Sequence, residues 1–177
     1  MKQDSKNIVR CNRVLFVCTG NICRSPTAEG VARGLAARHG VDHLFEFDSA
    51  GTHGYHVGDP PDPRSVAAAS RRGYDLAHLR ARRVGEFDFV RFDHVLAMGR
   101  DHLELLKRAC PKSHQKKLSL FLDFSERFDE DEVPDPYYGG ANGFEHVLDL
   151  IEDAATQLIL RLSGHRVDAV PGIPPGA

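Results

Sequence analysis

The sequence predicts an α/β fold in which helices cover both faces of a four-stranded parallel sheet. Four short apolar runs, at 13–18, 44–51, 92–98 and 117–124, are typical of strands. A segment of helical pattern follows each strand, and such alternation favours a parallel sheet. The length of 177 residues, with 41% hydrophobic and 27% charged residues, suits one globular domain with a substantial core.

The first strand and the helix after it carry the clearest local signals. The strand, "RVLFVC" at 13–18, is apolar and β-branched and ends at a Thr-Gly pair. A helix is predicted over 25–40, with Ser25 as its N-cap, Pro26 as its first residue and Gly40 at its end.

The remaining elements follow in chain order. We predict a strand at 44–51, a loop at 52–64, a helix at 64–73, a strand at 92–98, a helix at 100–110, a strand at 117–124, an acidic loop at 125–140 and an amphipathic helix at 143–164. In terms of domains, we expect a flexible N-terminal extension at 1–12, one folded domain at 13–164 and a loose C-terminal tail at 165–177.

Composition argues against several classes of function. The net charge of −2 lacks the basic excess that nucleic-acid phosphates require, so we expect no nucleic-acid partner. No apolar stretch approaches membrane-spanning length and the polar N-terminus lacks the core of a secretion signal, so we expect no membrane insertion. Four cysteines are too few for a secreted disulfide framework, which favours reduced thiols and a cytoplasmic protein.

The loop between the first strand and the first helix, "CTGNICRS" at 18–25, is the first candidate site. Ligands of open parallel sheets bind at the carboxyl ends of the strands, where this loop falls. A helix N-terminus attracts anions, phosphate above all. Gly20 and Asn21 both tolerate positive φ and so suit a tight curl. Arg24 adds a planar cation that matches two phosphate oxygens.

A thiol at the centre of such an anion site would be ionised. Cysteine pKa values near helix N-termini and arginines fall to roughly 3.5–7.5, against about 8.5 for a free thiol. Cys18 would then be a nucleophile aimed at a bound phosphorus atom, with Ser25 donating a hydrogen bond to its sulfur. The alternative is that Cys18 is a small buried hydrophobic residue and Arg24 an ordinary surface side chain.

A candidate acid lies in the second loop, "VPDPYYGG" at 133–140. Expulsion of a phenolate is eased by a nearby acid, and the flanking prolines hold Asp135 on an otherwise mobile segment. The acidic run 129–132 would raise the pKa of Asp135 by repulsion. The alternatives are that the run is a solvated loop and that Asp135 is a plain turn residue.

These motifs resemble the low molecular weight protein tyrosine phosphatases, in the form found in bacteria. "VLFVCTGNICRSPTAEG" is similar to the family's signature, and "DSAGT" and "DPYYGG" resemble its later landmarks, so that the resemblance runs from about 13 to 162. It implies a flavodoxin-like three-layer sandwich, no metal, no other cofactor and a cysteinyl-phosphate intermediate. A tyrosine-phosphorylated protein would be the substrate, and phosphate or a similar oxyanion the ligand.

The resemblance also implies roles for individual residues. Cys18 would be the nucleophile, Arg24 would bind the phosphoryl group, and Asp135 would protonate the leaving oxygen and then activate water. The rest of the loop would bind phosphate and hold its own shape: Thr19, Gly20, Asn21, Ile22, Cys23 and Ser25.

Three aromatic residues are candidates for the substrate cleft, because a tyrosyl ring lets phosphate reach a deep loop. Tyr137 and Tyr138 follow the acid and Tyr55 follows "DSAGT", although packing roles remain an alternative. One departure from the family concerns Leu79, which stands where a histidine often braces Asn21. His53 and His56 have no third ligand in view, so we expect loop residues and no metal.

Two functional questions stay open in the sequence. Cys23 is either a redox partner that forms a disulfide with Cys18, as the resemblance implies, or a packing thiol. The rival functions are a thiol-dependent arsenate reductase of the same fold, for which only Cys110 remains as a further thiol after Cys23, and a weak phosphotyrosine-binding module. Family analogy names a bacterial tyrosine kinase linked to exopolysaccharide production as a substrate.

Overall fold

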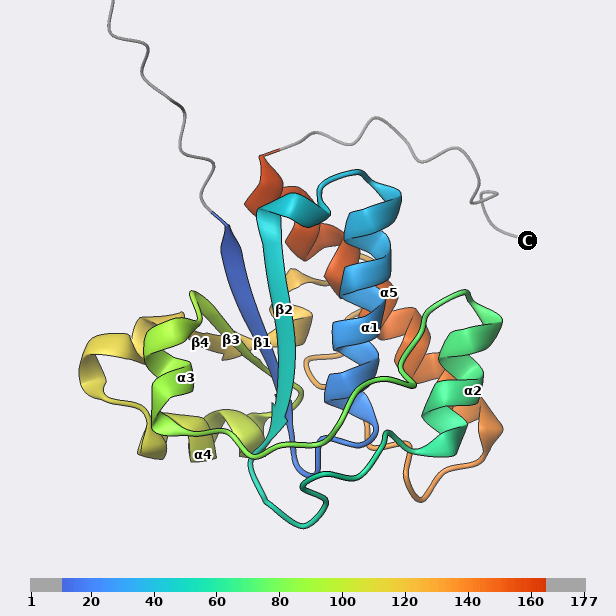
Figure 1. Cartoon of the computed structure of the whole chain (residues 1–177), viewed down its shortest axis with the longest axis horizontal. Coiled ribbons are helices and arrows are strands. Elements are labelled where there is room, and N and C mark those ends of the chain that lie inside the picture. The colour runs from blue at the N-terminus through green and yellow to red at the C-terminus, as the bar shows by residue number, and fades with distance from the viewer. Residues whose placement is uncertain (1–10, 165–177) are drawn as a thin grey trace, which may run out of the picture.

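Residues 11–164 are described by the computed structural model, and they form a parallel sheet between two layers of helices (Figure 1). The strands are β1 (Asn12–Cys18), β2 (Phe45–Gly51), β3 (His94–Ala97) and β4 (Leu118–Leu120), in the order β2-β1-β3-β4. All three pairings are parallel, so the predicted α/β class and four-stranded sheet are confirmed. This order is the flavodoxin-like one, and its topological switch point lies between β1 and β3.

Helices cover both faces of the sheet. The α-helices are α1 (Arg24–Arg38), α2 (Pro63–Arg71), α3 (Glu86–Arg91), α4 (Arg100–Ala109) and α5 (Ala141–Ser163), with short 3-10 turns η1 (Asp42–Leu44), η2 (Lys112–Lys117) and η3 (Phe121–Phe124). Figure 1 shows α1 and α5 on one side of the sheet and α3 and α4 on the other, with α2 beside α5. The carboxyl ends of β1 and β2 meet at one edge, where the loops that follow them gather.

The central strand β1 is buried on both faces, which explains its unbroken apolar run. Val14 and Phe16 belong to the core under α1 and α5, whereas Leu15 and Val17 belong to the core under α3 and α4. All four side chains are fully buried. Burial of each contributes about 1.5–3 kcal/mol relative to an exposed side chain, so the strand is fixed firmly where it delivers Cys18.

The observed secondary structure differs from the sequence prediction at three places. The helix α1 begins at Arg24, and its N-cap is Cys23, two residues before the predicted cap Ser25. The Ser25 hydroxyl contacts the Cys18 sulfur. The fourth strand has only three residues, and η3 replaces its predicted second half. The six-residue helix α3 was not predicted, since it is too short for a periodic apolar pattern.

Both predicted boundaries of the folded domain lie close to the limits of the described residues, 11–164. Of the expected extension 1–12, residues 1–10 lie outside the described residues, as does the expected tail 165–177. Asn12 already belongs to β1, and its side-chain Nδ2 donates to the Leu162 carbonyl at 3.4 Å. Within residues 11–164, no helix is long and apolar enough to cross a bilayer.

Candidate active site

The loop 18–24 joins the carboxyl end of β1 to the N-terminus of α1 at the switch point of the sheet. Asn21 has φ +57°, as expected, and is the one non-glycine residue with positive φ among those described. Gly20 does not have positive φ, so that part of the prediction was wrong. Space at position 20 is limited, because a Cβ there would lie 3.0 Å from His56 Cδ2.

The Cys18 thiol is buried at the end of β1 and contacts one hydroxyl group. Its Sγ lies 3.0 Å from Ser25 Oγ, in the first turn of α1. The same Ser25 Oγ lies 3.4 Å from the Ala50 carbonyl oxygen at the end of β2. Ser25 therefore links the first turn of α1 to the ends of β1 and β2, and its contact with Cys18 is the one that the sequence predicts.

Asn21 is the centre of the hydrogen bonds that hold the loop. Its Nδ2 donates to Ser25 Oγ and to Ser49 Oγ, both at 2.9 Å, and its Oδ1 accepts from the Arg82 backbone N–H at 2.9 Å. Ser49 Oγ in turn donates to the buried Glu29 carboxylate at 2.7 Å. Asn21 is thus braced without a histidine at position 79, where the buried Leu79 packs into the core.

The "DSAGT" motif is explained by how closely β2 approaches this loop. The Thr52 N–H donates to the Cys18 carbonyl at 2.8 Å, and the His53 N–H donates to the Thr19 carbonyl at 3.0 Å. A Cβ on Gly51 would lie 2.6 Å from the Thr19 oxygen, which a real Cβ does not tolerate. Only glycine at position 51 lets the two loops pair.

The candidate cation and the candidate acid lie side by side. Arg24 is nearly buried, and its guanidinium donates to the Val133 carbonyl at 3.2 Å and to Asp135 Oδ2 at 3.4 Å. The other oxygen, Asp135 Oδ1, accepts the Tyr137 N–H at 3.0 Å. Residues 111 positions apart in the sequence thus meet at one place.

The acidic loop before Asp135 is anchored to the start of α4. The first N–H of that helix, on Arg100, donates to Glu132 Oε2 at 2.7 Å, while the Arg100 guanidinium pairs with Asp131. The N-cap of α4 is Gly99, which has no side chain to satisfy the helix. Two carboxylates of the run 129–132 therefore hold the loop against Arg100, so the run is more than a solvated segment.

A buried histidine on α4 is the first functional candidate that sequence reasoning missed. His102 is 1% exposed, and its Nε2 lies 2.8 Å from Thr19 Oγ1 in the loop 18–24. Burial, with the nearby Arg24 charge, lowers the pKa of His102 to about 4, so its ring is neutral at pH 7. Nothing local in the sequence marks this contact, because the two residues are 83 positions apart.

The loop after β1 and the segment around Asp135 border a pocket of about 290 Å³. Its lining contains nearly every predicted site residue that reaches the surface: Cys18, Thr19, Gly20, Ile22, Cys23, Arg24, Tyr55, Asp135, Tyr137 and Tyr138. Asn21 and Ser25 lie behind the loop and brace it. His56 also lines the pocket, with its Nδ1 3.1 Å from Asp59 Oδ2, although the sequence suggested only a loop residue.

The three tyrosines stand at the rim of the pocket. Tyr55 is 75% exposed and Tyr138 is 91% exposed, so neither is a core residue. Tyr137 packs edge-on against Tyr138 and lies under the Arg64 guanidinium, at 5.3 Å from the ring centroid. Aromatic faces thus stand above a polar floor, an arrangement suited to a ring that carries an anionic group.

The cysteines and histidines form neither disulfides nor a metal cluster within the described residues. Cys11, Cys18, Cys23 and Cys110 are all free thiols. Cys23 lies in the pocket wall, where burial and the nearby Asp62 charge raise the pKa of its thiol to about 12. Among residues 11–164, no three His, Cys, Asp or Glu side chains gather as metal ligands.

Comparison with known proteins identifies the family. Residues 13–168 match the family model described as low molecular weight phosphotyrosine protein phosphatase. The chain is 43% identical over 157 residues to a putative low molecular weight protein-tyrosine-phosphatase of Synechocystis, covering 88% of this chain and 99% of that protein. It is 45% identical over 150 residues to the low molecular weight protein-tyrosine-phosphatase of Streptomyces coelicolor, covering 83% and 91% of the two chains.

Solved structures agree with this assignment. The protein tyrosine phosphatase of Entamoeba histolytica, crystallised with Hepes in its active site, superposes with a TM-score of 0.84 at 40% identity, over 86% of this chain and 97% of that one. YfkJ from Bacillus subtilis superposes with a TM-score of 0.81 at 37% identity, over 87% and 96%. The chain, with its cysteine loop, facing aspartate and tyrosine rim, belongs to the low molecular weight protein tyrosine phosphatases, which are hydrolases.

Proposed function

We propose that this protein hydrolyses phosphotyrosine in proteins through a cysteinyl-phosphate intermediate on Cys18. The observation that carries the proposal is the meeting of three groups at one pocket: the Cys18 sulfur, the Arg24 guanidinium and the Asp135 carboxyl. A nucleophile, an anion-binding cation and an acid are the parts that two-step phosphoryl transfer needs. The pocket opens between tyrosine rings, which suits a phosphorylated phenol.

In the first step, the Cys18 thiolate attacks phosphorus, the S–P bond forms, and the bond between phosphorus and the tyrosyl oxygen breaks. Asp135 gives its proton to the departing phenolate, which leaves as tyrosine. Arg24 and the N-terminus of α1 stabilise the charge on the phosphoryl oxygens. The short contact between Ser25 Oγ and Cys18 Sγ stabilises the thiolate, both before attack and when it leaves again.

In the second step, water attacks the cysteinyl phosphate. The Asp135 carboxylate now takes the water proton, the S–P bond breaks, and phosphate leaves with the Cys18 thiolate restored. No electrons are transferred, and no cofactor enters our scheme. The distance of 3.4 Å between Asp135 Oδ2 and Arg24 supports the dual role, because it keeps the carboxyl next to the phosphoryl site.

The rival functions receive less support. An arsenate reductase needs further thiols to reduce its intermediate, but Cys110 is buried under α4 and its Sγ donates to the Pro111 carbonyl, outside the pocket. A catalytically weak binding module would follow from a loose catalytic loop, yet Asn21 makes three hydrogen bonds of 2.9 Å. Hydrolysis of phosphotyrosine is therefore better supported than either rival function.

The biological setting that we propose rests on family analogy. The substrates would be tyrosine-phosphorylated proteins, with a bacterial tyrosine kinase of exopolysaccharide production as a candidate. The free thiols favour a reducing compartment, so we propose that the enzyme acts in the cytoplasm without a nucleic-acid partner.

The test is phosphate release from a phosphotyrosine peptide and a matched phosphoserine peptide, in the presence of a metal chelator. We expect turnover of phosphotyrosine alone, with none in Cys18→Ser and a strong decrease in Asp135→Asn. Cys110→Ser and Asp129→Asn make the same chemical changes away from the pocket, and both should keep wild-type rates. Activity in Cys18→Ser, or none in the wild type, would contradict the mechanism.

A further inference from the structure

A second hollow of about 230 Å³ lies beside the active-site pocket, on the α4 side of the loop after β2. Tyr55 lines the active-site pocket and His53 lines the second hollow. Their rings stack on each other, with centroids 5.1 Å apart and planes 11° apart. The two hollows therefore share one stacked pair of rings as a wall.

Backbone hydrogen bonds fix the second hollow relative to the catalytic loop. The His53 N–H donates to the Thr19 carbonyl at 3.0 Å, and the Val84 N–H donates to the Gly51 carbonyl at 2.9 Å. Both donors come from residues that line the second hollow. A peptide held in this hollow would therefore have a defined position relative to Cys18.

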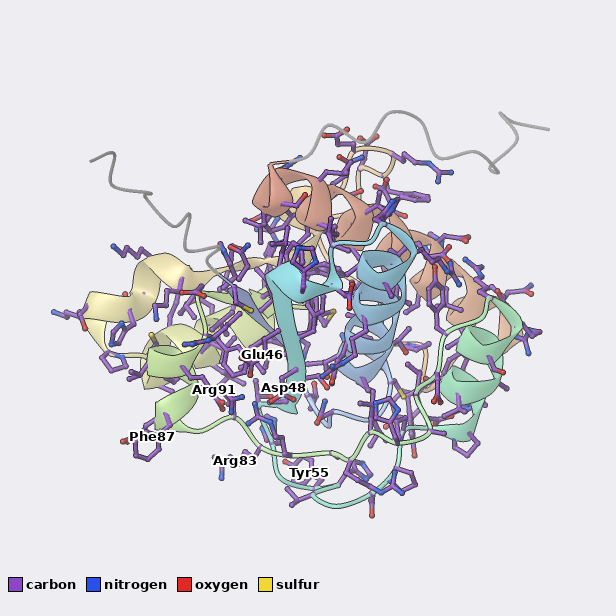
Figure 2. The ribbon with its side chains drawn as sticks, turned by 45° about the horizontal axis from the view of Figure 1, so that its top comes forward. Glu46, Asp48, Tyr55, Arg83, Phe87 and Arg91 are labelled. Carbon is purple, nitrogen blue, oxygen red and sulfur yellow. The ribbon has the colours of Figure 1, made fainter. Side chains whose placement is uncertain are left out.

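The hollow carries one cation without a counter-charge. Arg82 pairs with Asp48 and Asp88, each at 3.0 Å, whereas the next residue, Arg83, is exposed and its guanidinium has no ion pair or hydrogen bond to any part of residues 11–164. The Arg83 stem crosses the turn before Tyr55, since its Cδ lies 3.7 Å from where a Cβ on Gly54 would be. Figure 2 shows Arg83 and Tyr55 extending outward along the same edge of the molecule.

The floor of the hollow is apolar. It is formed by Val84 and by three residues of α4: Leu105, Leu106 and Ala109. Leu105 is 39% exposed, so part of the apolar floor is open to solvent. The hollow thus offers a free guanidinium next to an apolar surface, at the rim of a pocket that accepts phosphotyrosine under the proposed function.

We propose that this second hollow is a docking subsite for the substrate polypeptide. Arg83 binds the carboxylate of an Asp or Glu that flanks the phosphotyrosine, and the apolar floor receives a neighbouring apolar side chain. The inference rests on the proposed function and adds the class of peptide: phosphotyrosine in an acidic-apolar context. Charge complementarity supports this occupant, because a carboxylate would give Arg83 the partner that Arg82 already has.

The experiment compares kcat/KM for phosphotyrosine peptides of equal length with Glu, Ala or Lys next to the phosphotyrosine, placed on its N-terminal or its C-terminal side. The wild type should prefer Glu to Ala on one side by about two- to fivefold, the range for one exposed ion pair. Arg83→Gln should remove the preference, and Arg83→Glu should reverse it in favour of Lys. High salt should weaken it in the wild type.

Two controls separate docking from catalysis and from net charge. Free phosphotyrosine does not reach the hollow, so Arg83→Gln should hydrolyse it at the wild-type rate. Lys112→Gln removes the same charge from the exposed η2 turn, which precedes β4 at the opposite edge of the sheet, and should keep the peptide preference. Ala109→Trp, which fills the floor, should slow only peptides that also carry an apolar neighbour.

The outcomes are distinct. An unchanged Glu preference in Arg83→Gln, or no reversal in Arg83→Glu, would overturn the docking subsite while leaving the phosphatase intact. A wild type that hydrolyses neither free phosphotyrosine nor any of the peptides would overturn the proposed function itself, and this inference with it. Equal kcat/KM for all wild-type peptides would also reject the subsite.

Discussion

Asn21 offers the sharpest test of how the catalytic loop is held. Replacing it with alanine removes three hydrogen bonds of 2.9 Å and leaves a residue with φ +57° that has no side chain to stabilise that conformation. The partners are not affected equally. Ser25 and Ser49 keep other hydrogen-bonding contacts, to Ala50 and Glu29, whereas the Arg82 N–H loses its acceptor.

The free-energy change can be worked from these contacts. Loss of the two hydroxyl partners costs about 0.5–1.5 kcal/mol each, and an unsatisfied Arg82 N–H costs about 1–3 kcal/mol. The left-handed conformation adds about 1 kcal/mol for alanine. Asn21→Ala should therefore lower the free energy of unfolding by about 3–7 kcal/mol, a large part of the 5–15 kcal/mol typical of a domain. Asn21→Gly should recover only the conformational part, about 1 kcal/mol.

Urea unfolding of the wild type, Asn21→Ala and Asn21→Gly measures these free energies. The value of kcat/KM for phosphotyrosine reports whether the loop keeps its geometry. We expect a loss of about 10²-fold in kcat/KM for both variants, as for a displacement of about 1 Å in a catalytic group. A change of about 0.5 kcal/mol or less in Asn21→Ala, the size usual at surfaces, would refute the reasoning. So would a glycine variant as stable as the wild type, because strain alone would then explain the alanine result.

Three further predictions follow from other residues. Leu79→His should lower stability by about 1–3 kcal/mol, because it buries a polar ring without a partner, and should leave kcat/KM unchanged; a gain in activity would mean that the loop does need a histidine. The unfolded chain binds a proton on His102 near pH 6.5 and the folded chain only near pH 4. Falling pH therefore favours unfolding between these two pKa values, by up to about 1.4 kcal/mol per pH unit. His102→Asn should flatten the dependence of the free energy of unfolding on pH, as measured with urea. His43→Asn, at an exposed site, should leave that dependence unchanged. The raised pKa of Cys23 leaves little thiolate to form a disulfide with oxidised Cys18. After peroxide treatment, Cys23→Ser should therefore regain activity on addition of a thiol as fully as the wild type does. Much poorer recovery of activity would establish Cys23 as the redox partner.

The sequence predicts best what depends on neighbouring residues. The apolar run of β1, the curl at Asn21 and the cation at Arg24 lie within one stretch, and their chemistry is visible without tertiary contacts. The family resemblance assigns Arg24 and Asp135 to one site through two separate motifs, but the hydrogen bond between their side chains was not predicted.

Contacts between distant segments escaped prediction for a physical reason. His102 in α4 contacts Thr19 after β1, and Glu132 contacts the start of α4, but neither residue stands in a pattern that implies its partner. Ser25 shows the opposite failure: a local rule favours serine as an N-cap, but Ser25 lies inside the first turn of α1 and its hydroxyl contacts the Cys18 sulfur. Where a side chain serves the site, local propensity is a poor guide.

At Gly99, the stability of helix α4 and the position of Asp135 depend on the same contact. Because Glu132 supplies the cap that α4 lacks, the free energy that fixes the helix end also fixes the loop that carries Asp135. Serine or aspartate at position 99 would give the helix a cap of its own, but the Cβ would lie 2.6 Å from Glu132 Oε2 and displace it. A stabilising substitution here would therefore loosen the acid, so that heat tolerance and turnover cannot be improved independently at this glycine.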